Sequence, residues 1–168
     1  ENKIAYAGRS PRTCEPVIAD FCKQMGYTAV IFDAYDQNGA LIYHTNVMMS
    51  VGTKFAVICL SAITDEQQRQ AVVESLERTG KKVIDISFEQ MNNYAGNMLE
   101  LKTSDGKPIL VMSSTARKSL TSEQAKELSS YYKLLSPGLE YIENNGGGSA
   151  RCMLAEICFG ALVSGITT

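Results

Sequence analysis

The sequence predicts an α/β fold built from a repeating strand–strand–helix–strand unit. Two observations predict it: helical and strand-like apolar patterns alternate along the 168 residues, and the same order of elements returns after about fifty residues. Apolar residues make up 45% of the chain and charged residues 20%, which is typical of a globular domain. We therefore expect residues 1–168 to form a single domain with a mixed, propeller-like α/β repeat. The alternative is a chance similarity between ordinary hairpins.

The first expected elements are a strand, a helix and a second strand. Residues 3–7, KIAYA, form a short strand pattern. In the segment CEPVIADFCKQMG, apolar residues recur at helical spacing from Val17 to Met25, and Gly26 is placed to end the helix. AVIF, at 29–32, is an apolar run with the length of a buried strand, and the polar segment DQNGA then predicts a turn.

The complete repeat follows and occurs twice. NVMMSV and FAVICL predict two strands joined by GTK as a hairpin, and the helix DEQQRQAVVESLERTG, capped by Thr64 or Asp65, leads to the strand KKVIDIS. NMLELK and ILVMSS then flank TSDGKP, which predicts a hairpin with an Asp-Gly turn. SEQAKELSSYY is the next helix, with Thr121 or Ser122 as its cap.

The two hairpins resemble each other where they begin. The first opens on Asn46-Val-Met48 and the second on Asn97-Met98. This likeness supports the repeat, whose period is in the range of radial or stacked architectures.

Composition and charge argue against several classes of function. The net charge is −2 and no basic run is interleaved with aromatic residues, so we expect no nucleic-acid partner. No apolar run is long enough to span a membrane and no signal peptide opens the chain, so we expect a cytoplasmic protein. Five cysteines without a CxxC pair, together with a single histidine, argue against a zinc cluster and fit a reducing compartment.

The segment GGGSARC, residues 146–152, is the strongest candidate for chemistry. A thiol becomes reactive when cationic neighbours or backbone N–H groups favour its thiolate form. The three glycines can adopt positive φ angles and admit a close approach to the backbone, and Arg151 adds positive charge beside Cys152. The alternative is a glycine linker that leads to a buried cysteine. We expect core thiols at three other positions, Cys22, Cys59 and Cys158.

His44 and Arg12 are the other candidate functional residues. His44 is the only histidine, it lies where the strand pattern NVMMSV begins, and a nucleophilic cysteine normally needs an imidazole partner. Arg12 follows Pro11, which restricts the loop GRSPRT, and a guanidinium can bind a carboxylate through two hydrogen bonds. The alternatives are a histidine satisfied at the end of a strand and a loop arginine that is only solvated.

Four segments, GRSPRT, HTNVMM, NNYAGNMLEL and GGGSARCM, together resemble the guanidine-modifying superfamily. This group includes arginine deiminases, dimethylarginine dimethylaminohydrolases and arginine amidinotransferases. The segments follow the family's order through nearly the whole chain, and the closest resemblance is to bacterial amidinotransferase-like hydrolases linked to citrulline or arginine use. The resemblance implies the pentein fold, a five-bladed α/β propeller of ββαβ repeats. This chain would then be the C-terminal part, about three repeats, of a longer catalytic domain.

The resemblance also implies roles for individual residues. Cys152 matches the nucleophile that attacks the guanidino carbon and forms a covalent adduct, and His44 matches the general acid that protonates the leaving amine and then activates water. Arg12 matches the residue that binds the substrate α-carboxylate. Asn46 lies where some relatives carry an aspartate that contacts the guanidinium. The expected substrate is a small guanidine compound, the products are citrulline plus ammonia or an amine, and neither a metal nor a cofactor is implied.

Part of the family pattern lies outside this sequence. The family's acidic residue that orients the histidine precedes the strand matching residues 3–7, and the carboxylates that bind the guanidinium lie earlier still. We therefore expect the chain alone to be inactive and to need its N-terminal segment or a second copy to cover open sheet edges. Two alternatives remain open: amidino transfer to an amine acceptor, and a non-catalytic pentein binding module.

Overall fold

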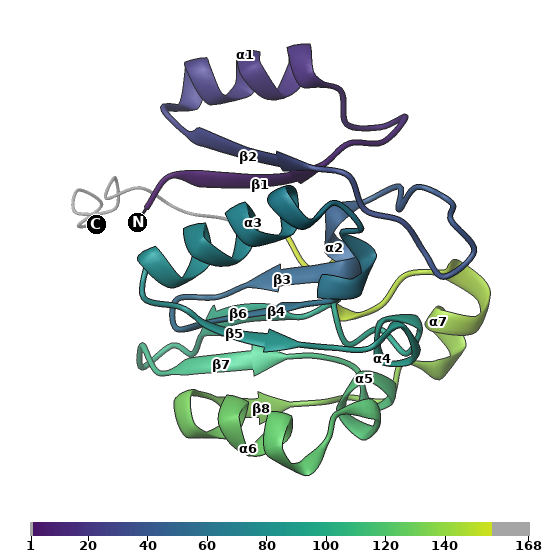
Figure 1. Cartoon of the computed structure of the whole chain (residues 1–168). Coiled ribbons are helices and arrows are strands. Elements are labelled where there is room, and N and C mark those ends of the chain that lie inside the picture. The colour runs from purple at the N-terminus through teal and green to yellow at the C-terminus, as the bar shows by residue number, and fades with distance from the viewer. Residues whose placement is uncertain (1, 156–168) are drawn as a thin grey trace, which may run out of the picture.

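The strands form three sheets that follow one another in chain order (Figure 1). The computed structural model describes residues 2–155. Within these residues, the first sheet has two parallel strands, β1 (Ile4–Gly8) and β2 (Thr28–Phe32). The second sheet contains β3 (Met49–Val51), β4 (Phe55–Ile58) and β5 (Lys82–Asp85). The third contains β6 (Leu99–Lys102), β7 (Pro108–Val111) and β8 (Lys133–Leu135).

Helices connect the parallel strands and cover the ends of the sheets. The crossover helices, one for each sheet, are α1 (Glu15–Met25), α3 (Glu66–Arg78) and α6 (Ser122–Tyr131). Shorter helices are α2 (Thr45–Met48), α4 (Phe88–Asn92), α5 (Ser114–Ser119) and α7 (Glu140–Gly146), together with the 3-10 turns η1 (Leu60–Ala62) and η2 (Ala150–Met153). Figure 1 shows α2, α4, α5 and α7 gathered at one end of the sheets.

The predicted strand–strand–helix–strand unit is confirmed for the second and third sheets. In each of them the first strand is antiparallel to the second, and the helix returns the chain to a third strand that is parallel to the second. The first sheet, within residues 2–155, has only the parallel pair and its helix. The fold is therefore a mixed α/β repeat. Its sheets stack in a row and do not close into a ring in the described part of the chain (Figure 1).

The helix boundaries follow the predicted caps. Gly26 ends α1 with a left-handed φ of 68°, which glycine adopts without steric cost. The side chain of Asp65 accepts a hydrogen bond from the Gln68 N–H at the start of α3. At the start of α6, Thr121 and Gln124 form a reciprocal capping box.

Two expectations about local structure need correction. Residues 46–48 of NVMMSV are helical, because the chain turns through α2 before β3 begins at Met49. His44 therefore lies at the N-cap of α2 rather than next to a strand. Of the expected core thiols, Cys59 is buried, Cys22 is only half-buried, and Cys158 lies outside the described residues.

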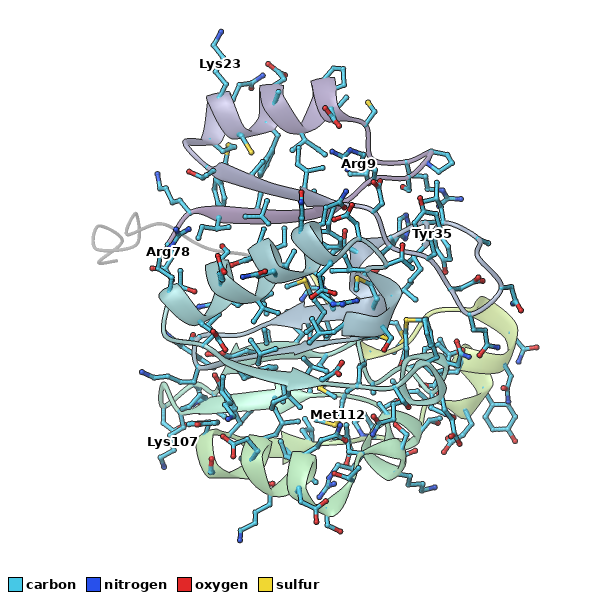
Figure 2. All side chains as sticks on the ribbon, viewed as in Figure 1. Arg9, Lys23, Tyr35, Arg78, Lys107 and Met112 are labelled. Carbon is cyan, nitrogen blue, oxygen red and sulfur yellow. The ribbon has the colours of Figure 1, made fainter. Side chains whose placement is uncertain are left out.

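The core is formed by apolar side chains between the sheets and their crossover helices. Figure 2 shows these side chains filling the space between the ribbons, with Met112 among them. Met48 and Met98, from the matching hairpin openings, are both fully buried. No helix in residues 2–155 is long and apolar enough to cross a membrane.

The second and third sheets meet through their first strands, β3 and β6. Glu100 on β6 accepts hydrogen bonds from the backbone N–H and the hydroxyl of Thr53, in the turn after β3. Before β6, a Cβ atom added at Gly96 would lie 2.4 Å from the Val47 carbonyl oxygen, so only glycine allows this approach to α2. The segments that precede β3 and β6 are therefore held side by side.

Candidate active site

A cavity of about 170 Å³ lies where the segments before β3 and β6 meet the glycine-rich loop. Three separate parts of the sequence line it: residues 43–47, residues 91–97 and residues 147–152. The cavity brings together the only histidine and the cysteine of GGGSARC. Polar or sulfur-bearing side chains in its wall include those of His44, Asn46, Tyr94, Asn97 and Cys152.

The sulfur of Cys152 faces two side-chain amides. Asn97 Nδ2 lies 3.3 Å from Cys152 Sγ, and Asn46 Nδ2 lies 3.9 Å from it. These asparagines are the residues that open the two matching hairpins. The sequence pattern that indicated the repeat thus places two N–H donors next to one thiol.

The glycines before Cys152 have distinct roles in shaping its loop. Gly147 has a φ of 67°, a backbone conformation that other residues adopt only with strain. A Cβ atom at Gly148 would lie 3.1 Å from the Cβ and 3.4 Å from the Sγ of Cys152. The backbone at Gly148 therefore packs closely against the Cys152 side chain, as expected from the glycine-rich segment. Cys152 itself is exposed, so the alternative of a buried cysteine after a linker does not hold.

A buried carboxylate anchors the same loop. Glu143 on α7 is 5% exposed, and it accepts a hydrogen bond of 2.6 Å from the Ser149 hydroxyl and one of 2.7 Å from the Thr115 hydroxyl. Because a buried carboxylate needs such partners, these bonds tie the loop to α7 and to α5.

Tyr94 closes another side of the cavity in a strained conformation. Its φ is 64°, which is unusual for a bulky side chain, and strain of this kind tends to be kept at functional sites. Its hydroxyl donates to the Glu143 carbonyl oxygen at 3.1 Å. Burial, followed by the charge of Glu143, raises the pKa of Tyr94, so the hydroxyl stays protonated and remains a donor at neutral pH.

Arg12 lies near this cavity but does not line it. Its guanidinium lies over the Tyr43 ring, 5.8 Å from the ring centre, and the Tyr43 and His44 rings are 4.8 Å apart. The Ser10 hydroxyl donates to the Tyr43 carbonyl oxygen and accepts from the Arg12 N–H, so the loop is fixed against the segment that carries His44. The structure thus places Arg12 one side chain away from the cavity wall.

The neighbouring Arg9 is engaged elsewhere. Its side chain forms ion pairs with Glu15 and Asp33, and the hydrogen bond to Glu15 is the main cause that raises the pKa of Arg9. Among residues 2–155, Arg12 forms no ion pair.

The thiols of the chain differ in their surroundings. Burial raises the pKa of Cys59 to about 11, so this thiol is protonated and inert at neutral pH. Cys14 is exposed at the start of α1 and far in sequence from the cavity. These two cysteines are internal references for any reaction at Cys152.

A larger cavity, of about 640 Å³, lies along β6 and at the end of β3, and Arg151 also lines it. Its lining includes four lysines, Lys3, Lys54, Lys81 and Lys102, but neither His44 nor Cys152. The chemistry expected from the sequence therefore belongs to the smaller cavity. The described residues hold no group of three or more His, Cys, Asp or Glu side chains arranged to bind a metal ion.

The described residues that line the smaller cavity supply no acidic side chain, because there is no aspartate or glutamate among them. The side-chain oxygen of Asn46 is buried and has no hydrogen-bond partner among residues 2–155, so it is an unused acceptor.

Sequence reasoning selected Cys152, His44 and Asn46 but missed three residues that shape the site, Tyr94, Asn97 and Glu143. For Asn97 a signal was present in the matching hairpin openings. No local pattern marks Tyr94 or Glu143, because their importance comes from contacts with segments far away in the sequence.

Comparison with known proteins relates nearly the whole chain to one family. A family model described as eukaryotic N,N-dimethylarginine dimethylhydrolase matches residues 1–159. The chain belongs to this family. It is thereby a member of the guanidine-modifying superfamily expected from its motifs. The comparison with curated protein sequences finds no match.

Solved structures of related fold come from proteins named arginine dihydrolase and AgrE. Apo ArgZ, an arginine dihydrolase from the ornithine–ammonia cycle in cyanobacteria, has a TM-score of 0.67 at 16% identity over 89% of this chain. A variant of its N-terminal domain, covalently bound to a reaction intermediate, has a TM-score of 0.61 at 18% identity over 89% of this chain. AgrE with ornithine and NAD⁺ has a TM-score of 0.65 at 17% identity, again over 89%.

These structures are longer than the chain. It covers 22% of ArgZ, 50% of the N-terminal domain of ArgZ and 20% of AgrE. At this level of identity the likeness shows a shared mixed α/β fold.

The buried carboxylate generates a prediction about the nucleophile loop. Replacing Glu143 by alanine leaves the hydroxyls of Ser149 and Thr115 without their acceptor, and we expect unfolding free energy to fall by about 2 kcal/mol. Hydrogen exchange in residues 146–152 should also become faster. Urea denaturation and exchange mass spectrometry measure the two effects. Asn144→Ala, at an exposed position of the same helix, is the matched control, and an equal effect there would contradict the anchor.

Proposed function

We propose that the intact protein is a cysteine-dependent hydrolase that acts on the guanidino carbon of arginine or a related compound. The observation that carries this proposal is the cavity that holds both Cys152 and His44, with amide N–H groups directed at the sulfur. Membership of the dimethylarginine dimethylhydrolase family supports it. So does the covalent intermediate in the related N-terminal domain of ArgZ.

The proposed reaction has two halves that share one sulfur. Cys152 Sγ forms a bond to the guanidino carbon, and the bond from this carbon to the leaving nitrogen breaks as the His44 imidazolium gives that nitrogen a proton. Neutral His44 then takes a proton from water, and the resulting hydroxide attacks the amidino carbon. The carbon–sulfur bond breaks, and the products are an ureido compound, which is citrulline if the substrate is arginine, plus ammonia or an amine.

Two further residues are proposed to bind the substrate. Asn46, whose side-chain oxygen has no hydrogen-bond partner among residues 2–155, is proposed to accept an N–H of the guanidino group. Arg12, held over Tyr43 at the edge of the cavity, is proposed to bind the substrate α-carboxylate.

The carboxylates that bind the guanidinium are proposed to lie in parts of the protein outside residues 2–155. The described cavity wall has none, and the chain covers half of the N-terminal domain of ArgZ. We also propose that the sheets are blades of a pentein propeller, completed by an N-terminal segment or a second copy. By itself the 168-residue chain should then associate and lack activity. Light scattering that showed a stable monomer would count against this part of the proposal.

The roles of the thiol and the imidazole are tested with 2-chloroacetamidine, a small amidine that alkylates guanidine-processing thiols. In the intact protein we expect a single adduct on Cys152, no turnover after Cys152→Ala, and a kcat at least about 100-fold lower after His44→Ala. Cys14→Ala is the control and should leave turnover unchanged. Turnover that survived Cys152→Ala would exclude the mechanism. Absence of both adduct and turnover would favour the binding module, and amidino transfer to an added amine would favour a transferase.

The role of Arg12 is tested with a pair of substrates that differ in one group. Arg12→Ala should raise KM for arginine at least about tenfold, because a charge-assisted hydrogen-bond pair is lost, while kcat changes little. For agmatine, which has no α-carboxylate, the same variant should behave like the wild type. Equal effects on both substrates would assign Arg12 to the structure of the loop instead.

A further inference from the structure

The Asn97 side chain connects the two segments that carry the candidate catalytic residues. Its Nδ2 donates to the Asn46 carbonyl oxygen at 3.2 Å, and its Oδ1 accepts from the Arg151 N–H at 3.0 Å. Asn46 is two residues from His44, and Arg151 precedes Cys152. Asn97 is only 4% exposed, so these bonds form away from water, where a lost partner is costly.

The backbone partners fix the orientation of this amide. The Asn46 carbonyl can only accept and the Arg151 N–H can only donate. In a flipped amide, the Asn97 oxygen would face the Asn46 carbonyl oxygen and the Asn97 nitrogen would face the Arg151 N–H. The remaining N–H of Nδ2 must therefore point toward Cys152 Sγ, 3.3 Å away. A donor in this place stabilises negative charge on the sulfur.

The approach of Asn97 to Asn46 depends on the preceding residue. A side chain at Gly96 would collide with the Val47 carbonyl, so glycine is what lets this segment reach α2. The pair Gly96–Asn97 thus brings a fixed N–H donor against the thiol, and the spacing between the His44 and Cys152 segments is set by the same amide.

We propose that Asn97 is a further catalytic residue: its amide donates a hydrogen bond to the Cys152 sulfur and activates it as a nucleophile, while it holds the His44 and Cys152 segments at their working separation. The effect of Asn97 on turnover rests on the proposed function. The contact with the sulfur itself can be tested without any substrate.

The test compares two replacements of Asn97 in the intact protein. Asn97→Asp keeps the shape and the acceptor for the Arg151 N–H, but a carboxylate oxygen replaces the nitrogen that donates to the Cys152 sulfur and to the Asn46 carbonyl. Asn97→Ala removes the donating nitrogen and the acceptor. The readout is the alkylation rate of Cys152 by iodoacetamide, a neutral reagent, with exposed Cys14 in the same sample as the reference and buried Cys59 as a reporter of unfolding.

We expect the Cys152 rate to fall about tenfold in Asn97→Ala and further in Asn97→Asp, since hydrogen bonds to charged groups are worth this much and a carboxylate repels the thiolate. The rate at Cys14 should not change. If Asn97 only holds the loop, Asn97→Asp, which keeps the bond to the Arg151 N–H, should react at least as fast as Asn97→Ala, and this result would overturn the proposal. Asn93→Asp makes the same change outside the cavity, where the amide bonds the Glu89 carbonyl, and it should have no effect.

A second measurement covers the case in which the Asn97 variants do not fold. In the nitrogen-15 NMR spectrum of the folded protein, Cys152→Ala should shift one of the two side-chain amide protons of Asn97, the one bonded to sulfur. The other proton, bonded to the Asn46 carbonyl, should move little. Equal or absent shifts would overturn the proposal. Because neither measurement uses turnover, a failure here is distinct from a failure of the proposed hydrolase, which Cys152→Ala turnover decides.

Discussion

The hydrogen bonds of one buried amide, that of Asn97, hold the candidate site together. They are possible because β3 and β6 lie side by side, so that the segments before both strands reach the same end of the sheets. One segment supplies His44 and Asn46, and the other supplies Asn97 itself. The amide then binds the backbone next to Cys152. If this amide lost its partners, the direct hydrogen bonds between the His44 segment, the Asn97 segment and the backbone beside Cys152 would be lost.

The glycine-rich loop contributes shape, and α7 contributes rigidity. Gly147 supplies a left-handed turn and Gly148 allows the sulfur to pack against the backbone. Glu143 then fixes the loop through Ser149, so that glycines, which are free in an unfolded chain, become ordered here. Cys152 is thus exposed but fixed in position, as the proposed mechanism requires.

Much of the fold follows from local sequence, and the site follows only in part. The hairpins, the crossover helices and the caps at Gly26, Asp65 and Thr121 were predictable because their causes lie within a few residues. Helix α2 was not, since NVMMSV has the composition of a strand and tertiary packing decides its first half. The roles of Tyr94 and Glu143 could not be predicted for the same reason. The strain of Tyr94 and the burial of Glu143 arise from contacts with segments distant in sequence. The repeat did carry a signal for the site, because its matching asparagines, Asn46 and Asn97, both face the Cys152 sulfur.

The most direct test of the central claim is a rapid acid quench of the intact protein during its first turnover of arginine, followed by peptide mass spectrometry. We expect a covalent amidino adduct that appears before product and is confined to the peptide containing Cys152. Product formation without any adduct on Cys152, or with the adduct on a different residue, would contradict it.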